Sequence, residues 1–299
     1  MSQKIFTFDS QMLNTFQACE RKYQYSFIDQ VAPEEKAEAL ERGDLMHRML
    51  EVYYSLQLKD GFKYNDTWNT LVSAGITPSI DKSFISIQKF AIQAGQYFGT
   101  ILSLDSDEID GTIFQFKEYS SHFQNDSWNP LAVEEVGSKV LFENDEYKII
   151  YNFKIDLIAE KGNIICPWDH KTAKRREAPS SLSNQFIGYC FGLDTNNIIV
   201  NKIGFQKTLT PEQRFNRYIL TIDDERIQEW RENTLEWAFR MMEANEREKY
   251  PLNLTSCDKY SGCIFAPICE SPISSREWKI ERDFKVGNKW DVAEILEAK

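Results

Sequence analysis

Two apolar runs near the middle of the chain each carry a carboxylate, and the second run adds a lysine. Asp156 stands in the first run, and Asp169 and Lys171 stand two residues apart in the second. Side chains of a β-strand alternate between two faces, so we expect Asp169 and Lys171 on one face and His170 on the other. If the neighbouring strand brings Asp156 alongside, two carboxylates and one ammonium group meet at a single point.

This combination of groups is suited to phosphodiester chemistry. Hard divalent cations such as Mg²⁺ and Mn²⁺ bind carboxylate and carbonyl oxygens. A metal ion held in this way orients a water molecule and stabilises charge on a phosphate during its transfer. A lysine beside the ion is placed to position that water or to take its proton. The pattern therefore predicts a metal-dependent phosphodiesterase.

Predicted helices on both sides of these runs carry further polar residues. Upstream, Leu45 and Met49 belong to an amphipathic helical pattern, and His47 falls off its apolar stripe. Downstream, Gln185 and Tyr189 are four residues apart in a second helical pattern. They share one face, because residues at i and i+4 lie one above the other.

The chain as a whole reads as a mixed α/β protein. Hydrophobic residues make up 42% of its 299 residues, which is ample for a sizeable core. Loop-like stretches are predicted at 59–66, 104–111 and 122–130, where Gly, Asp, Asn and Pro break the apolar pattern. The periodicity predicts the following elements: helices from about 9 to 104, strands from about 131 to 172, a helix near 180–192, strands near 197–207 and 217–222, and a long helix from 223 to about 249.

In their order along the chain, these motifs resemble the RecB-type branch of the PD-(D/E)XK nuclease superfamily. The shared elements are Gly-x-x-x-His, a Glu before the first strand, Gly/Asn-x-x-x-Asp, Asp-x-Lys-Thr and Gln-x-x-x-Tyr. The chain departs from the pattern ahead of Asp156, where Asn152 and Phe153 stand instead of a small residue. The resemblance implies a mixed central β-sheet flanked by helices, with N-terminal helices that bring His47 to the metal from outside the sheet.

The resemblance also implies a role for each matching residue. The implied metal ligands are His47, Asp156, Asp169 and the carbonyl of His170. Lys171 would assist the attacking water, and Glu134 would be a further acidic member of the site. The adjacent Glu135 would face the other way on a strand, so only one of the two points inward. Gln185 and Tyr189 would contact DNA or brace Lys171.

The six cysteines carry a separate signal. No N-terminal apolar stretch suggests a signal peptide, and no run approaches the roughly 20 apolar residues needed to cross a bilayer, so we expect a cytoplasmic protein with no membrane contact. Clustered cysteines in that compartment more often bind metal than form disulfides. Cys166 and Cys190 lie in apolar runs and are interpreted as buried, whereas Cys257, Cys263 and Cys269 share a short segment broken by Gly and Pro.

Three thiolates require a fourth ligand, and the resemblance supplies Cys19. In the iron–sulfur subset of these nucleases, which includes CRISPR-associated exonucleases and the AddB subunit of a recombination nuclease, one cysteine precedes the core and three follow it. By this resemblance, Cys19, Cys257, Cys263 and Cys269 would bind a [4Fe–4S] cluster that holds the C-terminus against the N-terminal helix. Here five residues separate each pair of successive late cysteines, where the family more often has two in the first gap. Zinc and free thiols therefore stay open, although a Cys-x-x-Cys zinc knuckle is absent.

These expectations divide the chain into three parts. They are an N-terminal helical region over 1–130 that contributes Cys19 and His47, a nuclease core over 131–250, and a cysteine-rich segment and tail over 251–299. The charge balance of 35 Lys+Arg against 46 Asp+Glu, −11 overall, argues against a protein that simply coats DNA. A nuclease needs only a local positive track, and Lys174, Arg175 and Arg176 are placed to neutralise backbone phosphates.

The residues thus predict a metal-dependent phosphodiesterase, and the resemblance implies an exonuclease on single-stranded DNA ends. Recombination, repair, phage DNA metabolism and CRISPR spacer processing are all compatible contexts. No Gly-x-x-x-x-Gly-Lys-Ser/Thr motif is present, so unwinding would come from a helicase partner. The alternative is a non-catalytic DNA-end-binding scaffold subunit, against which the complete set of Asp156, Asp169 and Lys171 argues. A decoy of a host nuclease has only the acidic charge in its favour.

Overall fold

The computed structural model describes residues 3–34, 38–59, 61, 65–78, 81–172, 177–259 and 262–287. The first half of the chain forms β1 (Lys4–Phe8), α1 (Ser10–Ala18), α2 (Glu20–Tyr23), η1 (Gln24–Ile28), β2 (Val31–Pro33), α3 (Glu38–Ser55), α4 (Asp66–Ser73), α5 (Phe84–Ile101) and α6 (Ser106–His122). The core strands and their helices are β3 (Asn129–Glu143), β4 (Tyr147–Lys161), β5 (Ile164–Thr172), α7 (Asn184–Leu193), β6 (Asn197–Ile203), α8 (Pro211–Arg214), β7 (Phe215–Thr221) and α9 (Asp224–Arg247). The C-terminal segment contains η2 (Leu254–Ser256), α10 (Ala266–Glu270), η4 (Ile273–Ser275), α11 (Arg276–Asp283) and β8 (Phe284–Val286).

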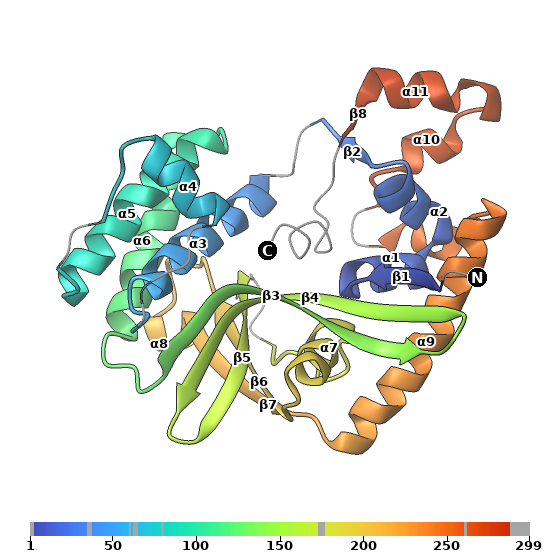
Figure 1. Ribbon diagram of the computed structural model, residues 1–299. Coiled ribbons are helices and arrows are strands. Elements are labelled where there is room, and N and C mark those ends of the chain that lie inside the picture. The colour runs from blue at the N-terminus through green and yellow to red at the C-terminus, as the bar shows by residue number, and fades with distance from the viewer. Residues whose placement is uncertain are drawn as a thin grey trace.

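A mixed central sheet organises the molecule, with strand order β1-β4-β5-β6-β7 and β3 also paired with β4. Helices α3 to α6 gather at one end of this sheet, while α7 and α9 lie beneath it (Figure 1). The predicted α/β class, a mixed sheet flanked by helices, is confirmed. None of the helices in the described ranges is long and apolar enough to cross a membrane.

The long strand β4 has a gap along one of its edges. On one side it pairs with β3 along most of its length. On the other side it is shared between β1, whose parallel ladder ends at Tyr151, and β5, whose antiparallel ladder begins at Leu157. Between those two ladders, over residues 152–156, no described strand pairs with this side of β4.

The sheet separates two hydrophobic cores. One core lies under α3, α4, α5 and α6, and the other lies between the opposite face and helices α1, α7 and α9. Strand β6 alternates as a strand should, with Ile199 in the first core and Ile198 and Val200 in the second. Strand β4 does not, because Ile155 belongs to the second core and Leu157 to the first. The alternation of side chains between the two faces of β4 is therefore interrupted at Asp156, and we call this a change of phase.

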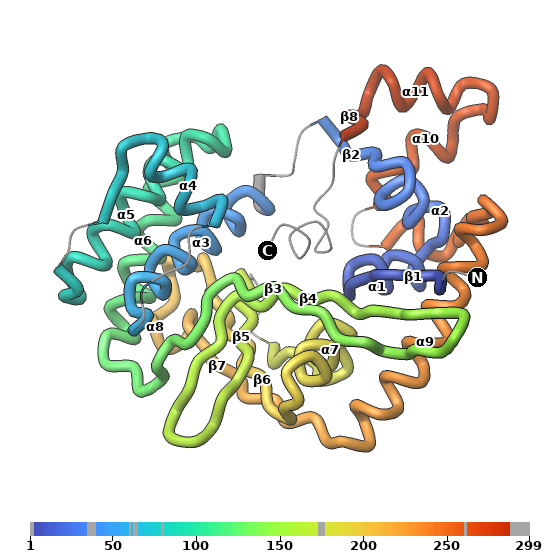
Figure 2. Tube along the Cα trace, viewed as in Figure 1, coloured from blue at the N-terminus to red at the C-terminus, as the bar shows by residue number. Residues whose placement is uncertain are grey.

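The C-terminal segment packs against the N-terminal region. Strand β2 pairs with β8 in a small antiparallel sheet. A third, small core joins Tyr25 and Val31 to Phe265, Ile268 and Phe284. Figure 2 shows α10, α11 and β8 at the same side of the molecule as β2 and α2, although the two groups of elements are far apart in the sequence.

Two local expectations from the sequence were wrong. The region from about 9 to 104, which was expected to be helical, contains the strand β2. Strand β1, which joins the central sheet beside β4, lies just before that region and was not predicted. The predicted loop at 104–111 is largely the first turn of α6, because Asp105 caps this helix by accepting a hydrogen bond from the backbone N–H of Glu108 at 2.8 Å. Gly111 lies inside that helix and does not end it.

Candidate active site

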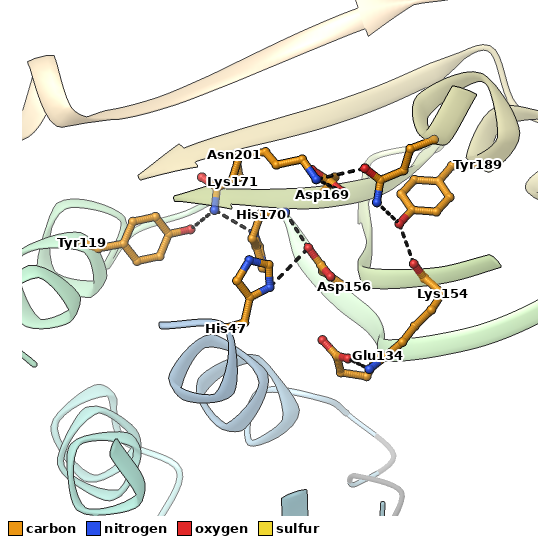
Figure 3. A network of polar contacts seen from close by, with 11 residues as sticks. His47, Tyr119, Glu134, Lys154, Asp156, Asp169, His170, Lys171, Tyr189 and Asn201 are labelled. Atoms are coloured by element: carbon orange, nitrogen blue, oxygen red, sulfur yellow. Dashed lines mark hydrogen bonds and ion pairs between the residues drawn. The ribbon is translucent and has the colours of Figure 1, made fainter. Parts of the chain in front are cut away.

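Strand β5 presents its two charged residues to helix α7. The ammonium group of Lys171 lies 3.0 Å from Oδ1 and 2.9 Å from Oδ2 of Asp169. The side chain of Asp169 is only 1% exposed, whereas that of Lys171 is 42% exposed. His170 turns to the other face, toward α3, as the strand alternation predicted (Figure 3).

Asp156 occupies the position where β4 changes phase. The ladder between β4 and β5 ends at the pair Leu157 and Trp168, so the next step would set Asp156 opposite Asp169. Instead, Oδ2 of Asp156 accepts a hydrogen bond of 2.6 Å from the backbone N–H of His170. The same oxygen lies 3.7 Å from Nδ1 of His47, which α3 brings to the site from outside the sheet.

Glu134 lies opposite Asp156 on the other neighbour of β4. The flanking pairs are Val133 with Leu157 and Glu135 with Ile155. Glu134 has a φ of 52°, in the left-handed region that L-residues rarely adopt. Its carboxylate forms an ion pair with Lys154 and is largely buried. The structure thus places Glu134 next to Asp156, among the acidic side chains of the site.

Helix α7 braces Lys171 through a chain of hydrogen bonds. Lys171 donates to Oε1 of Gln185 at 2.9 Å, and Nε2 of Gln185 donates to Oη of Tyr189 at 2.8 Å. Tyr189 in turn donates to the backbone carbonyl of Lys154 at 2.6 Å, inside the gap along β4. Of the two roles expected for this pair, bracing Lys171 matches these contacts, and Tyr189 is buried.

The site concentrates negative charge away from water. Burial raises the pKa of Asp169 to about 6, with Lys171 opposing the rise and Asp156 adding to it. Burial also raises the pKa of Asp156, against the hydrogen bond from His170. Burial raises the pKa of Glu134 as well. The positive charge of Lys154 opposes this rise, and the negative charge of Asp156 adds to it.

A fourth carboxylate, Glu51, was missed by the sequence analysis. It lies one helical turn after His47 on α3 and is buried, accepting hydrogen bonds from Asn65 at 2.6 Å and Thr67 at 2.7 Å. Burial raises its pKa to about 7, and the charge of Glu134 adds to the rise. The i, i+4 spacing from His47 was the available signal, because such residues share a helix face.

These groups have the composition of a divalent-cation site. Four acidic side chains, Glu51, Glu134, Asp156 and Asp169, face two ammonium groups, those of Lys154 and Lys171. The excess negative charge is therefore two when all are ionised, which one divalent cation balances. The buried Oδ2 atom of Asp169 also accepts no well-directed hydrogen bond. Within the described residues, however, no three His, Cys, Asp or Glu side chains are already arranged around an ion position.

The cysteines expected to act together lie in one region. The sulfur of Cys19 accepts a hydrogen bond from the backbone N–H of Asn253 at 3.5 Å, and the thiol of Cys257 lies 3.8 Å from the carbonyl of the same asparagine. Burial raises the pKa of Cys269, with Arg276 and Arg21 opposing it. The thiols outside this group, those of residues 166 and 190, are buried as expected, and all six thiols are free.

The positive track expected at Lys174, Arg175 and Arg176 lies outside the described residues, so its role stays a prediction.

Comparisons with known proteins place the chain in a family. Residues 10–270 match the family described as "PD-(D/E)XK nuclease superfamily". A search of curated proteins finds no match. Among solved structures, one titled "Crystal structure of SSO0001" is 17% identical over 60% of this chain and 75% of that chain, with a TM-score of 0.31, which is too low to assign fold or function. The family match spans every strand of the central sheet except β1, together with the site and the cysteines up to Cys269, and the chain belongs to the PD-(D/E)XK nuclease superfamily.

Proposed function

We propose that this protein is a metal-dependent deoxyribonuclease that acts as an exonuclease on single-stranded DNA ends. The observation that carries the proposal is that Asp156, Asp169 and Lys171 lie close together at the gap in the sheet. The superfamily to which the chain belongs consists of nucleases that are usually metal-dependent. The choice of DNA, of single strands and of exonucleolytic cleavage rests on the motif resemblance to the RecB-type branch.

The proposed ligands of Mg²⁺ or Mn²⁺ are His47, Asp156, Asp169 and the carbonyl of His170, with Glu134 as an outer acidic member. A bound ion would supply electrophilic activation of the phosphate and a more acidic water. Burial lowers the pKa of His47, which keeps the imidazole neutral and able to act as a ligand.

Lys171 would act directly on the reacting groups. Its ammonium group is held by Asp169 and Gln185, and the side chain is still exposed enough to reach a substrate. Two fixed acceptors leave one N–H of the ammonium to point at a water molecule or a phosphate oxygen. Gln185 and Tyr189 therefore contribute by fixing the direction of that donor.

The test is digestion of end-labelled single-stranded DNA with Mg²⁺ or Mn²⁺ by anaerobically purified protein. Lys171→Ala should abolish digestion. Lys139→Ala is the matched control, because Lys139 also contacts a carboxylate and a carbonyl oxygen but lies away from the site. A circular single strand separates the two modes of cleavage, since an exonuclease leaves it intact. Absence of digestion with retained binding of DNA ends would instead support the scaffold alternative.

We also propose that Cys19, Cys257, Cys263 and Cys269 bind a [4Fe–4S] cluster. Support comes from the shared contacts of two of these thiols with Asn253 and from the docking of the C-terminal segment onto the N-terminal region. The protein should absorb broadly near about 400 nm when purified anaerobically. Cys257→Ser should lose this absorption and Cys166→Ser should keep it. Stoichiometric zinc without iron would favour the zinc alternative.

The positive track and the cellular context complete the proposal. Lys174, Arg175 and Arg176 would contact phosphates, so replacing them with glutamine should weaken DNA binding and flatten its dependence on salt. A helicase or recombination protein would supply the single strand, and free thiols are consistent with action in the cytoplasm.

A further inference from the structure

The imidazole of His170 is held on the face of the sheet opposite to Asp169. Its Nδ1 lies 2.8 Å from Nδ2 of Asn201, and its ring stacks on that of Tyr54 with centroids 5.6 Å apart and planes 17° apart. Figure 3 shows this contact as a dashed line between the labelled side chains of Asn201 and His170. The hydrogen bond persists in either orientation of the amide, since the neutral ring carries its proton on Nε2 or on Nδ1 accordingly.

Asn201 is itself fixed by its surroundings. It is 0% exposed and lies beside His170 in the parallel ladder between β5 and β6. Its amide also contacts Oη of Tyr119 at 2.9 Å, and that hydroxyl lies 2.7 Å from Oη of Tyr54. Both tyrosine hydroxyls lie within 3.4 Å of the guanidinium of Arg217. Buried polar networks of this kind resist movement, because each broken bond leaves a desolvated group unpaired.

The backbone of His170 needs such support on one side. The ladder with β4 has already ended at Trp168, so the peptide of His170 has no backbone partner on β4. Its N–H is directed instead at the carboxylate of Asp156. A shift of the backbone at His170 would move both the N–H that binds Asp156 and the carbonyl of His170, and Asp156 and this carbonyl are both proposed metal ligands.

We propose that Asn201 is a positioning residue for the metal site. By holding the His170 ring, it fixes the backbone N–H that orients Asp156 and the carbonyl that faces the ion. This proposal rests on the proposed function, because it assumes that the metal binds at these residues. Loss of a hydrogen bond behind a ligand typically lowers metal affinity about 10–100-fold. Asn201→Leu should therefore raise the Kd for Mn²⁺ by about tenfold or more.

Calorimetric titration of the protein with Mn²⁺, in the absence of DNA, tests this role. The variants are Asn201→Leu, His170→Phe and the double variant, with His170→Phe retaining an aromatic ring against Tyr54. Gln115→Leu is the matched control, because Gln115 is an equally buried amide, bonded to Arg214 instead of the His170 network. Thermal unfolding identifies variants that fail to fold, and His170→Phe then carries the test.

The effects of the two variants should not multiply. If Asn201 acts through the His170 ring, each single variant weakens Mn²⁺ binding, and the double variant binds about as weakly as either single variant. The metal concentration for half-maximal digestion should rise in parallel, with a smaller change in kcat at saturating metal. Mn²⁺ binding equal to wild type, or effects that multiply in the double variant, would overturn the proposal. A wild-type protein that binds no Mn²⁺ would remove the proposed metal site and this role with it.

Discussion

Replacing Gly188 by alanine should destabilise the protein and displace the helix that braces Lys171. Gly188 lies in α7, and a Cβ at this position would lie 2.0 Å from Oη and 2.5 Å from Cζ of Tyr151. Carbon atoms in favourable contact are about 3.5–4.0 Å apart, so the ring or the helix would have to move by about 1 Å or more. Tyr151 cannot give way easily, because it is fully buried and its ring packs edge-on against Phe8 and Trp230.

Two opposing effects set the magnitude. Overpacking of a filled core costs about 1–3 kcal/mol or more. Alanine recovers about 1 kcal/mol over glycine inside a helix. A fully buried ring at these distances places the overpacking cost at the upper end, so we expect a net loss of about 1–2 kcal/mol. Gly111→Ala in α6 is the matched control, because its new Cβ would meet only the flexible ammonium group of Lys207, at 3.7 Å. That variant should gain about 0.5–1 kcal/mol.

Urea unfolding of both variants measures the difference, with the slope expected to stay unchanged. The digestion assay should show a further loss in Gly188→Ala, because a shifted α7 moves Gln185 and Tyr189 away from Lys171. The reasoning is refuted if Gly188→Ala is as stable as Gly111→Ala, since the helix-propensity gain that both substitutions share would then be the whole effect and the contact with Tyr151 would cost nothing.

Three further outcomes follow from the structure. Asp169→Asn should abolish digestion yet stabilise the metal-free protein, because an ionised carboxylate whose pKa is raised from 3.8 to about 6 opposes folding, by at most about 3 kcal/mol. This gain in stability should be complete above about pH 6, shrink as the pH falls and vanish below about pH 4, where Asp169 of the wild type is protonated in both the folded and the unfolded state. Unfolding curves of both proteins at several pH values measure it. Gly43→Ala would place a Cβ 3.0 Å from Oγ1 of Thr172, next to Lys171, so digestion should fall severalfold while stability in urea changes by less than about 1 kcal/mol. Arg217→Lys should lower stability in urea by about 2–3 kcal/mol, because lysine lacks the planar fork with which the largely buried guanidinium meets Asp126 and lies against aromatic rings.

Local sequence patterns predicted those parts of the site that depend on one element at a time. The alternation of a strand was enough to place Asp169 and Lys171 together and His170 apart. The i, i+4 spacing of a helix was enough to place Gln185 beside Tyr189. Helix α9 was also predicted from its capping aspartate, Asp223, whose side chain accepts from the backbone N–H of Arg226.

Residues that depend on the pairing of distant elements were not predicted. Lys154 was passed over because nothing in the local sequence shows that Glu134, on the paired strand β3, lies within reach of its ammonium group. Asn201 was passed over because its partner is on a strand reached only after a helical crossover. Strand β1 was missed for a similar reason, since so short a segment, five residues long, becomes a strand only by pairing with β4.

Asp156 shows why such a site needs the whole sheet. In a strand of strict period two, its carboxylate would face one core and would be reached from one side only. Here β4 changes phase at this residue, which lies within the gap between β1 and β5. Opposite it stands Glu134, whose backbone is in the left-handed region. The Asp156 carboxylate therefore meets His47 from the α3 side and the backbone of His170, while Asp169 and Lys171 approach from the α7 side. The same irregularity that deprives β4 of part of its ladder allows residues from both faces of the sheet to meet at the proposed metal site.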